Sequence, residues 1–360
     1  MYTDQEKRQL IEMCKLTRKE DFLRTLNGED PESILPVFFG VDDAGGSAAY
    51  RLCGPWLHDC SRLLPTADGT IDAWGVHFSA NEAGAMGAMP TPGFQLLTID
   101  DLPHWRDFVE IPKIPDDINW EMVAKKEIEM SGLDRNESAL CSIMGIMPFQ
   151  ELIGMLGFEE CFMAFYEEPE AIKEILEEFR VLYTKLSEVA IEYWKPELGY
   201  IADDTASKYS PFLSLDMFRE FLLPVYDSIM KPYRDNGIPV ELHNCGKCEI
   251  FMDDFKDIGV KYWEPAQEQN DLIALQKKYK RDFFLCGGLD YVPPVDPTKV
   301  THEEISEMVK AYYERMSENA PFFALVFVLA AWGDPVMMQI NGWVQEELFY
   351  QGRAYYSRQK

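Results

Sequence analysis

Two short apolar runs with a helix-forming segment between them decide the fold class: Gly199-Tyr200-Ile201-Ala202-Asp203 and Pro239-Val240-Glu241-Leu242-His243. Short, largely apolar runs are typical of parallel strands that are covered on both faces. Between the two runs, Ser214 can cap a helix and Asp216 favours its first turn. A strand, a helix and a second strand in this order predict a parallel βαβ unit.

The same pattern continues in both directions along the chain. Further strand-like runs are Val37–Gly40, Leu140–Gly145, Val260–Trp263, Phe283–Gly287 and Phe322–Leu329. A helix is predicted where apolar residues recur three and four positions apart, at Ile172, Ile175, Leu176, Phe179, Tyr183 and Leu186. Asp271 and Thr301 are expected to cap two more helices. Repeated β/α units fit either a doubly wound sheet or a TIM barrel.

Two features favour the barrel. There is no GxGxxG fingerprint after an early strand. Chemically interesting residues also end several different strands, which is where barrel active sites are built. We therefore predict one (β/α)8 TIM-barrel domain over residues 1–360, with an elaborated N-terminal region at 1–118 and the main barrel at 119–360. Residues 41–118 are rich in Gly, Pro and Asp, and we expect them to cover the barrel mouth.

Composition excludes several functional classes. Hydrophobic residues make up 47% of the 360 residues, which is enough for a sizeable core and excludes a disordered or fibrous chain. The 34 basic and 62 acidic residues give a net charge of -28, so nucleic acid and anionic membrane surfaces are poor partners. We find no signal-peptide core and no apolar run of membrane-spanning length. The eight cysteines are scattered, which indicates reduced thiols and a cytoplasmic protein.

The second strand-like run carries a candidate metal site. Because side chains alternate in an extended chain, Glu241, His243 and Cys245 point to one face. A carboxylate, an imidazole and a thiol are all competent zinc ligands. Cys286 ends a later strand and would complete a tetrahedral site if the strand ends meet in a barrel. The alternative is that these are packed core cysteines and a hydrogen-bonded histidine.

Other strand ends carry candidate catalytic and substrate-binding residues. Asp203 and Asp204 are adjacent acids at a strand end, where they need a cation, a proton or a donor nearby. We interpret them as catalytic; the alternative is a solvated loop with an Asp that caps a helix. Trp74 lies in an aromatic turn and Trp332 follows the last apolar run. Both could wall a substrate pocket, although core packing explains such aromatics equally well.

Four segments together resemble uroporphyrinogen-decarboxylase-like proteins. They are Lys19–Glu29, Pro148–Pro169, Asp203-Asp204 followed by Leu213–Phe218, and Cys286-Gly287-Gly288-Leu289-Asp290. The resemblance covers nearly the whole chain. It implies a (β/α)8 barrel whose active site lies at the carboxyl ends of the strands.

The chain departs from the decarboxylases themselves. They carry an arginine-rich loop near the N-terminus that grips the carboxylates of the substrate. The equivalent stretch here, Phe39–Gly46, holds two acids, and no arginine follows before Arg51. A polyanionic porphyrinogen would meet the wrong charge, so porphyrinogen decarboxylation is disfavoured.

His243-Asn244-Cys245 instead resembles the His-x-Cys motif of the zinc methyltransferases of this superfamily. Those enzymes move methyl groups to or from a cobalamin that a small corrinoid protein carries. The coenzyme M branch has a further cysteine near the C-terminus, and Leu329–Gly333 has none. The turn at Trp74-Gly75-Val76 and the long N-terminal region are more similar to the bacterial branch that demethylates methoxylated aromatics.

The resemblance therefore implies a methyltransferase that acts on a methoxylated aromatic. Zinc would be held by Glu241, His243, Cys245 and Cys286, and the methyl group would pass to cobalt(I) of a corrinoid protein partner. Asp203 or Asp204 would orient the substrate or protonate the leaving oxygen. Two alternatives stay open: a methyl-corrinoid:thiol methyltransferase and a non-catalytic zinc-binding scaffold.

Overall fold

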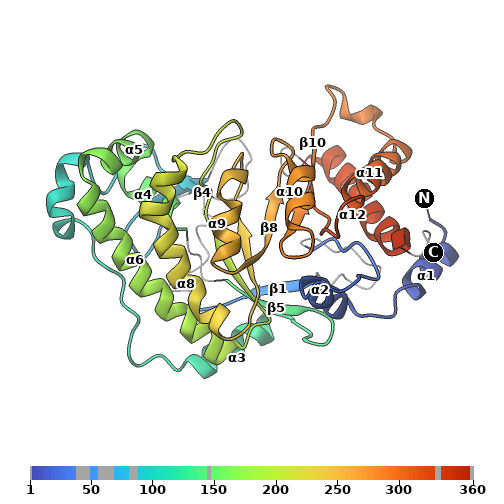
Figure 1. Ribbon diagram of the computed structural model, residues 1–360, viewed down its shortest axis with the longest axis horizontal. Helices are drawn as coiled ribbons and strands as arrows, with labels where there is room; N and C mark the ends of the chain where they lie inside the picture. Colours follow the sequence, from blue (N-terminus) through green and yellow to red (C-terminus); the bar gives the residue numbers. More distant parts are fainter. Residues whose placement is uncertain are drawn as a thin grey trace. The chain divides into compact units, whose positions relative to one another are not determined.

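The structure is a computed structural model that describes residues 2–37, 49–55, 69–80, 88–143, 147–328 and 334–356. Helices and strands alternate along most of the chain (Figure 1). The strands are β1 Tyr50–Cys53, β2 Thr70–Ile71, β3 His77–Ala80, β4 Ala88–Pro90, β5 Ala139–Ser142, β6 Leu198–Ala202, β7 Val240–His243, β8 Val260–Ala266, β9 Phe284–Gly287, β10 Leu289–Tyr291 and β11 Val326–Val328. The helices are α1 Asp4–Glu12, α2 Arg18–Leu26, α3 Trp120–Ser131, α4 Pro148–Leu156, α5 Phe158–Glu167, α6 Pro169–Val189, α7 Leu215–Met217, α8 Leu223–Asp235, α9 Met252–Asp257, α10 Leu272–Tyr279, α11 His302–Ser317 and α12 Pro335–Tyr355.

The main sheet has six strands in the order β1-β5-β6-β7-β8-β9. Strands β6 and β7 are parallel, with Gly199 opposite Val240, and β8 and β9 are parallel too. Two smaller sheets accompany it: β10 pairs with β11 in parallel, and β2, β3 and β4 form an antiparallel sheet. The predicted α/β class with a parallel sheet is confirmed.

Single parallel bridges continue the strand order beyond β9. One joins Cys286 to Phe323 and the other joins Pro36 to Ala324. The Ala324 N–H donates to the carbonyl of Leu35 over 2.8 Å. Six strands and these two bridged segments give the eight strand positions of a (β/α)8 barrel.

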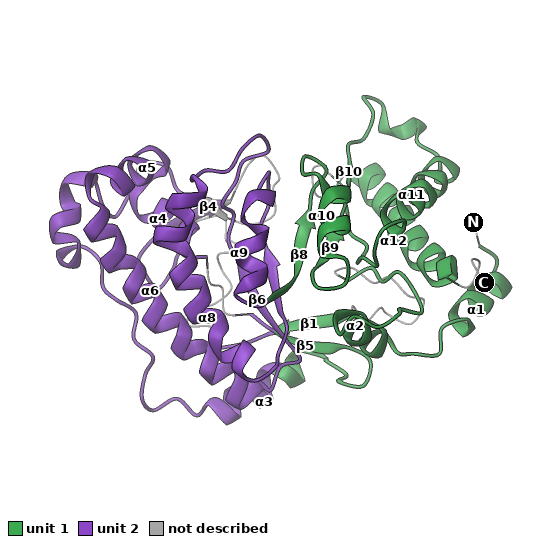
Figure 2. Cartoon of the chain, in the orientation of Figure 1, with its two compact units in different colours: residues 1–52, 128–141, 260–360 green, residues 53–127, 142–259 purple. Residues whose placement is uncertain are grey.

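The chain divides into two compact units (Figure 2). Unit 1 comprises Met1–Leu52, Ile128–Cys141 and Val260–Lys360, and unit 2 comprises Cys53–Glu127 and Ser142–Gly259. Within unit 1, α12 packs against α1 and α11; within unit 2, α6 packs along α8, as Figure 1 shows. Neither border of a unit falls at residue 118. The single domain with an N-terminal elaboration stays a prediction.

Helix α6 shows how the sequence pattern becomes packing. All six of its predicted apolar residues are buried: Ile172, Ile175, Leu176, Phe179, Tyr183 and Leu186. The predicted caps are also confirmed, because the side chains of Ser214, Asp271 and Thr301 accept the N–H groups of Met217, Ala274 and Glu304. Caps and a covered apolar face stabilise these helices, and the helices in turn hold the strands between them in place.

Strand β1 was not predicted. Arg51 is half-buried and Leu52 is 37% exposed, so the four residues lack a continuous apolar run. Two stretches used in the sequence interpretation, Phe39–Gly46 and Leu329–Gly333 with Trp332, lie outside the described residues.

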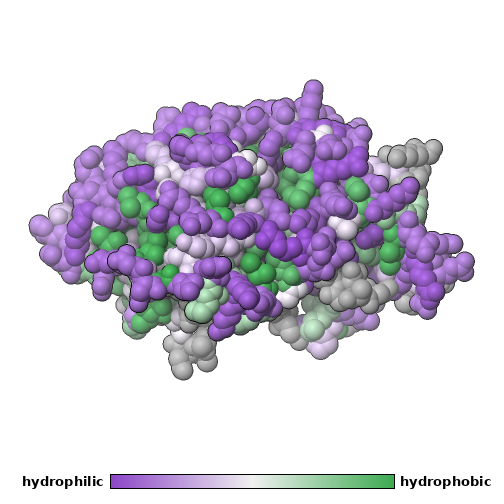
Figure 3. All heavy atoms as spheres, turned by 90° about the horizontal axis from the view of Figure 1, so that it is seen from below, coloured by the Kyte–Doolittle hydropathy of each residue, from purple (hydrophilic) through white to green (hydrophobic). Residues whose placement is uncertain are grey.

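The face of the molecule in Figure 3 is mostly hydrophilic. Hydrophilic side chains cover most of the face that Figure 3 shows, with smaller hydrophobic patches between them. Within the described ranges, no helix combines the length and the apolar character needed to cross a membrane.

Candidate metal centre

The candidate site is built where β6 and β7 end. Ala202 lies opposite His243 in the parallel register, and the Asp203 N–H donates to the His243 carbonyl over 2.9 Å. Beyond the strands, the Cys245 N–H donates to Oδ1 of Asp204 over 2.8 Å. The two loops that follow these strands are therefore held side by side at the carboxyl edge of the sheet.

Three side chains in unit 2 bring metal-binding atoms together at this edge. Nε2 of His243 lies 3.6 Å from Sγ of Cys245 and 3.8 Å from Oδ1 of Asp204. All three ligand atoms lie within 4.8 Å of one another. The side chains of His243 and Asp204 are 23% and 35% exposed, so a dissolved ion can reach the site.

These distances fit a zinc ion. With Zn–N and Zn–S bonds of about 2.0 and 2.3 Å, tetrahedral geometry places the nitrogen and sulfur roughly 3.6 Å apart. The same reasoning places a nitrogen and a carboxylate oxygen about 3.4 Å apart. The observed pairs need little or no movement to meet these values. A mixed N, S and O donor set is also one that zinc accepts.

Asp204, and not Glu241, supplies the carboxylate of this three-residue group. Glu241 is fully buried on β7, two residues before His243 and hence on the same face of the strand. Its assignment as a ligand stays a prediction. The alternation of side chains along a strand predicts which ligands of one strand share a face. Asp204 follows a different strand, so its contribution depends on the pairing between β6 and β7.

Cys286, the predicted fourth ligand, is a fully buried residue of β9. It belongs to unit 1, whereas the three donors belong to unit 2. Its role as a ligand stays a prediction.

Cys248 lies under the same loop. Its Sγ donates to the carbonyls of Asn244 and Gly246 over 3.5 and 3.8 Å. Burial raises the pKa of the Cys248 thiol well above its ordinary value, and the nearby Cys245 raises it further. Cys248 therefore packs beneath the turn and hydrogen-bonds its backbone.

The adjacent acid Asp203 has different partners. Its carboxylate is fully buried and accepts the N–H groups of Phe149 and Gln150, at the start of α4, over 2.6 and 3.0 Å. The hydroxyl of Tyr226 donates to it over 2.7 Å. Burial raises the pKa of Asp203 to about 7, although these hydrogen bonds lower it. Asp203 thus attaches the N-terminus of α4 to the end of β6.

Trp74 lies in a tight turn in which Oδ1 of Asp72 accepts the N–H groups of Trp74 and Val76. Its indole is 2% exposed, donates to the hydroxyl of Tyr183 over 3.0 Å and packs edge-on against Phe179. These contacts attach the turn to α6. A substrate-binding role for Trp74 stays a prediction, and Trp332 lies outside the described residues.

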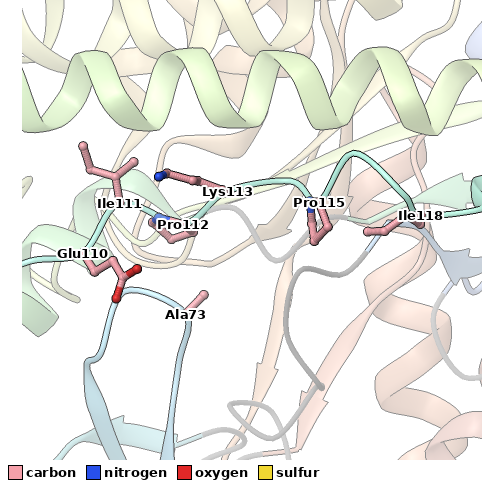
Figure 4. Close-up of a pocket in the computed structure, with 7 residues that line it drawn as sticks. All are labelled: Ala73, Glu110, Ile111, Pro112, Lys113, Pro115 and Ile118. Atoms are coloured by element: carbon pink, nitrogen blue, oxygen red, sulfur yellow. The ribbon is translucent and has the colours of Figure 1, made fainter.

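A hollow of about 350 Å³ lies elsewhere in unit 2 (Figure 4). Its walls are Ala73, Glu110, Ile111, Pro112, Lys113, Pro115 and Ile118. Among the described residues, none of the predicted site residues lines it, so it is separate from the candidate metal centre.

The fold and the site together define a barrel-type α/β protein with a candidate metal centre at the carboxyl ends of its strands. The uroporphyrinogen decarboxylase (URO-D) family model matches residues 135–324, which is just over half of the chain. The chain belongs to the uroporphyrinogen decarboxylase family. The matched range includes Asp204, His243, Cys245 and Cys286.

A solved structure agrees with this fold. A methyltransferase from Methanosarcina mazei is similar with a TM-score of 0.58 and 15% identity, over 95% of this chain and 100% of that one. At this identity the similarity shows the fold alone. A sugar phosphate isomerase/epimerase from Parabacteroides distasonis gives a TM-score of 0.35 at 11% identity, over 66% of this chain and 76% of that chain, and nothing follows from it. No protein with a curated description matches the chain.

Proposed function

We propose that this protein is a methyltransferase that moves the methyl group of a methoxylated aromatic to cobalt(I) of a corrinoid carrier protein. The observation that carries the proposal is the group of Asp204, His243 and Cys245, whose ligand atoms lie within 4.8 Å of one another at the carboxyl ends of β6 and β7. That edge is where barrel enzymes of many kinds build their active sites.

His243, Cys245 and Asp204 would hold a zinc ion, and three protein ligands leave one position of a catalytic zinc open. Whether Glu241 or Cys286 is a ligand stays a separate prediction. When bound, zinc supplies Lewis acidity towards the ether oxygen. In the reaction the aryl oxygen–methyl bond breaks and its electron pair stays on oxygen, while cobalt(I) provides the pair for the new bond to the methyl carbon. Stabilising the charge that develops on oxygen is the main requirement, because an unassisted phenolate leaves poorly.

Of the two adjacent acids, we assign the role at the reacting oxygen to Asp204. It is partly exposed beside His243, whereas Asp203 is fully buried with its oxygens engaged by α4 and Tyr226. As an ionised ligand Asp204 would help to keep the metal beside the reacting oxygen, and that oxygen would take its proton from water. Asp203 would act only by placing β6 and α4.

Two further findings support a methyltransferase. The chain belongs to the uroporphyrinogen decarboxylase family, and its His-x-Cys motif resembles that of the zinc methyltransferases of this superfamily. The similar structure from Methanosarcina mazei is described as a methyltransferase. The donor set also suits the thiol-methylating alternative, in which zinc activates a thiolate. The choice between the two depends on the substrate.

The test uses zinc-loaded protein and free cobalamin in place of the carrier. Chemically reduced cob(I)alamin is mixed with a panel of methoxybenzoates, and formation of methylcobalamin is followed by its absorption spectrum. In parallel, methylcobalamin is offered to a panel of thiols. Demethylation that depends on zinc and is lost in Cys245→Ala supports the proposal. Turnover only with thiols favours the alternative, and zinc binding without either reaction favours the scaffold.

A further inference from the structure

Asn244 stands between the two candidate ligands His243 and Cys245 in the sequence. It is fully buried. Its Oδ1 accepts the N–H of Thr205 over 3.1 Å, and its Nδ2 donates to Oγ1 of the same threonine over 2.8 Å. The side-chain amide of Asn244 therefore accepts one hydrogen bond from Thr205 and donates another to it, and the two bonds together fix the orientation of the amide.

Thr205 directly follows the candidate ligand Asp204 and is also fully buried. The pair therefore joins the residue after one candidate ligand to the residue between the other two. Hydrogen bonds from backbone N–H groups also join the two loops. The Lys247 N–H donates to the Ser207 carbonyl over 2.8 Å, in addition to the Cys245 N–H bond to Asp204.

The Asn244–Thr205 pair and these backbone hydrogen bonds hold the two loops close to each other. Asp204 and Cys245 lie beyond the ends of their strands, so β-sheet pairing alone does not hold them. The two loops can therefore move apart unless other contacts join them. A buried, doubly hydrogen-bonded pair beside the ligands opposes this separation, and so reduces the free energy that metal binding must supply for ordering the loops.

We infer that Asn244 and Thr205 are positioning residues that hold the loops after β6 and β7 together and thereby set the separation of the three metal-binding atoms. The inference rests on the proposed function, since it concerns the metal centre proposed there. Neither residue touches the ion in this scheme; both act through Asp204, His243 and Cys245.

The experiment compares three variants with the wild type. Thr205→Val has nearly the same shape but no hydroxyl, so the hydrogen bond from Nδ2 of Asn244 to this hydroxyl is lost. Thr205→Ser keeps the hydroxyl and serves as the conservative rescue. Tyr233→Phe is the matched control, because it removes a buried hydroxyl that lies 2.7 Å from Oγ of Ser142, while its ring packs at Gly199 at the start of β6.

Two readouts are measured on each protein. The first is backbone hydrogen exchange in the metal-free protein, followed by mass spectrometry of peptides that cover residues 240–250. The second is the affinity for Zn²⁺, with the absorption spectrum of bound Co²⁺ as a report of the ligand geometry. We expect Thr205→Val to exchange faster in this segment and to bind Zn²⁺ about 10-fold or more weakly, which is typical for loss of a supporting hydrogen bond at a metal site. Thr205→Ser and Tyr233→Phe should keep the wild-type affinity and spectrum.

The outcomes separate the two proposals. Unchanged exchange or unchanged Zn²⁺ affinity in Thr205→Val overturns the positioning role, and so does an equal loss of affinity in Tyr233→Phe. If Thr205→Val does not fold, Thr205→Ala removes the same hydroxyl without the added methyl group, and the same losses are expected. A wild-type protein that binds no Zn²⁺ contradicts the proposed function, and exchange alone then decides whether the pair holds the loops.

Discussion

The imidazole of His243 and the thiol of Cys245 lie on the same side of the chain with Nε2 and Sγ 3.6 Å apart, although one residue separates them. Both residues are partly exposed, whereas Asn244 between them is fully buried and hydrogen-bonds Thr205. A single short segment therefore presents two metal-binding atoms outward and a structural anchor inward.

The first prediction concerns the zinc content. Purified wild-type protein should contain about one zinc per chain, and Cys245→Ala should lose it, because removal of one of few ligands from a half-exposed site leaves too little binding energy. Elemental analysis of dialysed protein measures this directly. Cys286→Ala, analysed beside it, tests the predicted fourth ligand.

Cys161→Ala is the control for the cysteine variants. Cys161 is fully buried in α5, and burial and the charge of Asp203 raise the pKa of its thiol far above the ordinary value. It should keep its zinc. Zinc retained in Cys245→Ala at the wild-type level would remove the His243–Cys245 pair from the metal centre.

The two adjacent acids should respond differently to the same substitution. Asp204→Asn should weaken zinc binding and methyl transfer with little effect on folding, because the side chain is partly exposed at the metal centre. Asp203→Asn should lower the free energy of unfolding by about 1–3 kcal/mol, because an amide group turned towards the N–H groups at the start of α4 leaves a buried donor unpaired. Chemical denaturation and zinc titration of both variants test the distinction. A similar response of the two acids in both measurements would contradict it.

Asp203 should also make the stability depend on pH. Burial raises its pKa from 3.8 to about 7 in the folded protein. Between these values the folded state binds more protons than the unfolded state, so this contribution is complete below about pH 4 and is lost as the pH rises through 7. The difference in unfolding free energy between wild type and Asp203→Asn should therefore shrink from pH 5 to pH 8. A difference that stays constant over this range would mean that the carboxyl group does not titrate there.

Much of the fold could be predicted from local pattern. The buried face of α6, the caps at Ser214, Asp271 and Thr301, and the central strands all follow from periodicity and capping chemistry, which act over a few residues. Strand β1 could not be found in this way. Its Arg51 and exposed Leu52 interrupt the apolar run, and only pairing with a neighbouring strand makes it a strand.

Only the part of the candidate site that follows a single strand could be predicted from the sequence. Alternation along one strand placed His243 and Cys245 on one face, and the structure brings their metal-binding atoms together. It could not show that Asp204 joins them, because that depends on the register between β6 and β7. Nor could it separate Asp203 from Asp204, whose different roles are set by α4 and Tyr226, which are distant in sequence.

The last prediction concerns Gly246, the residue that turns the chain after Cys245. Its φ is +91°, and an added Cβ would lie 2.5 Å from the Ala206 carbonyl oxygen and 2.7 Å from that of Ser207. Gly237 is a matched control in the same unit, because its φ is +67° but nothing lies within 4 Å of an added Cβ. Gly237→Ala should therefore cost only the left-handed strain of about 1–2 kcal/mol and leave zinc binding unchanged.

Gly246→Ala should cost more, on the order of 3 kcal/mol, because backbone strain is joined by a clash with backbone atoms that cannot rotate away. The clash pushes on the loop that carries Asp204, so zinc affinity should fall together with stability. Thermal unfolding and zinc titration of the two alanine variants measure both effects. Equal stability losses, or a Gly246→Ala protein that binds zinc like the wild type, would show that the close approach of the two loops does not determine the geometry of the metal centre.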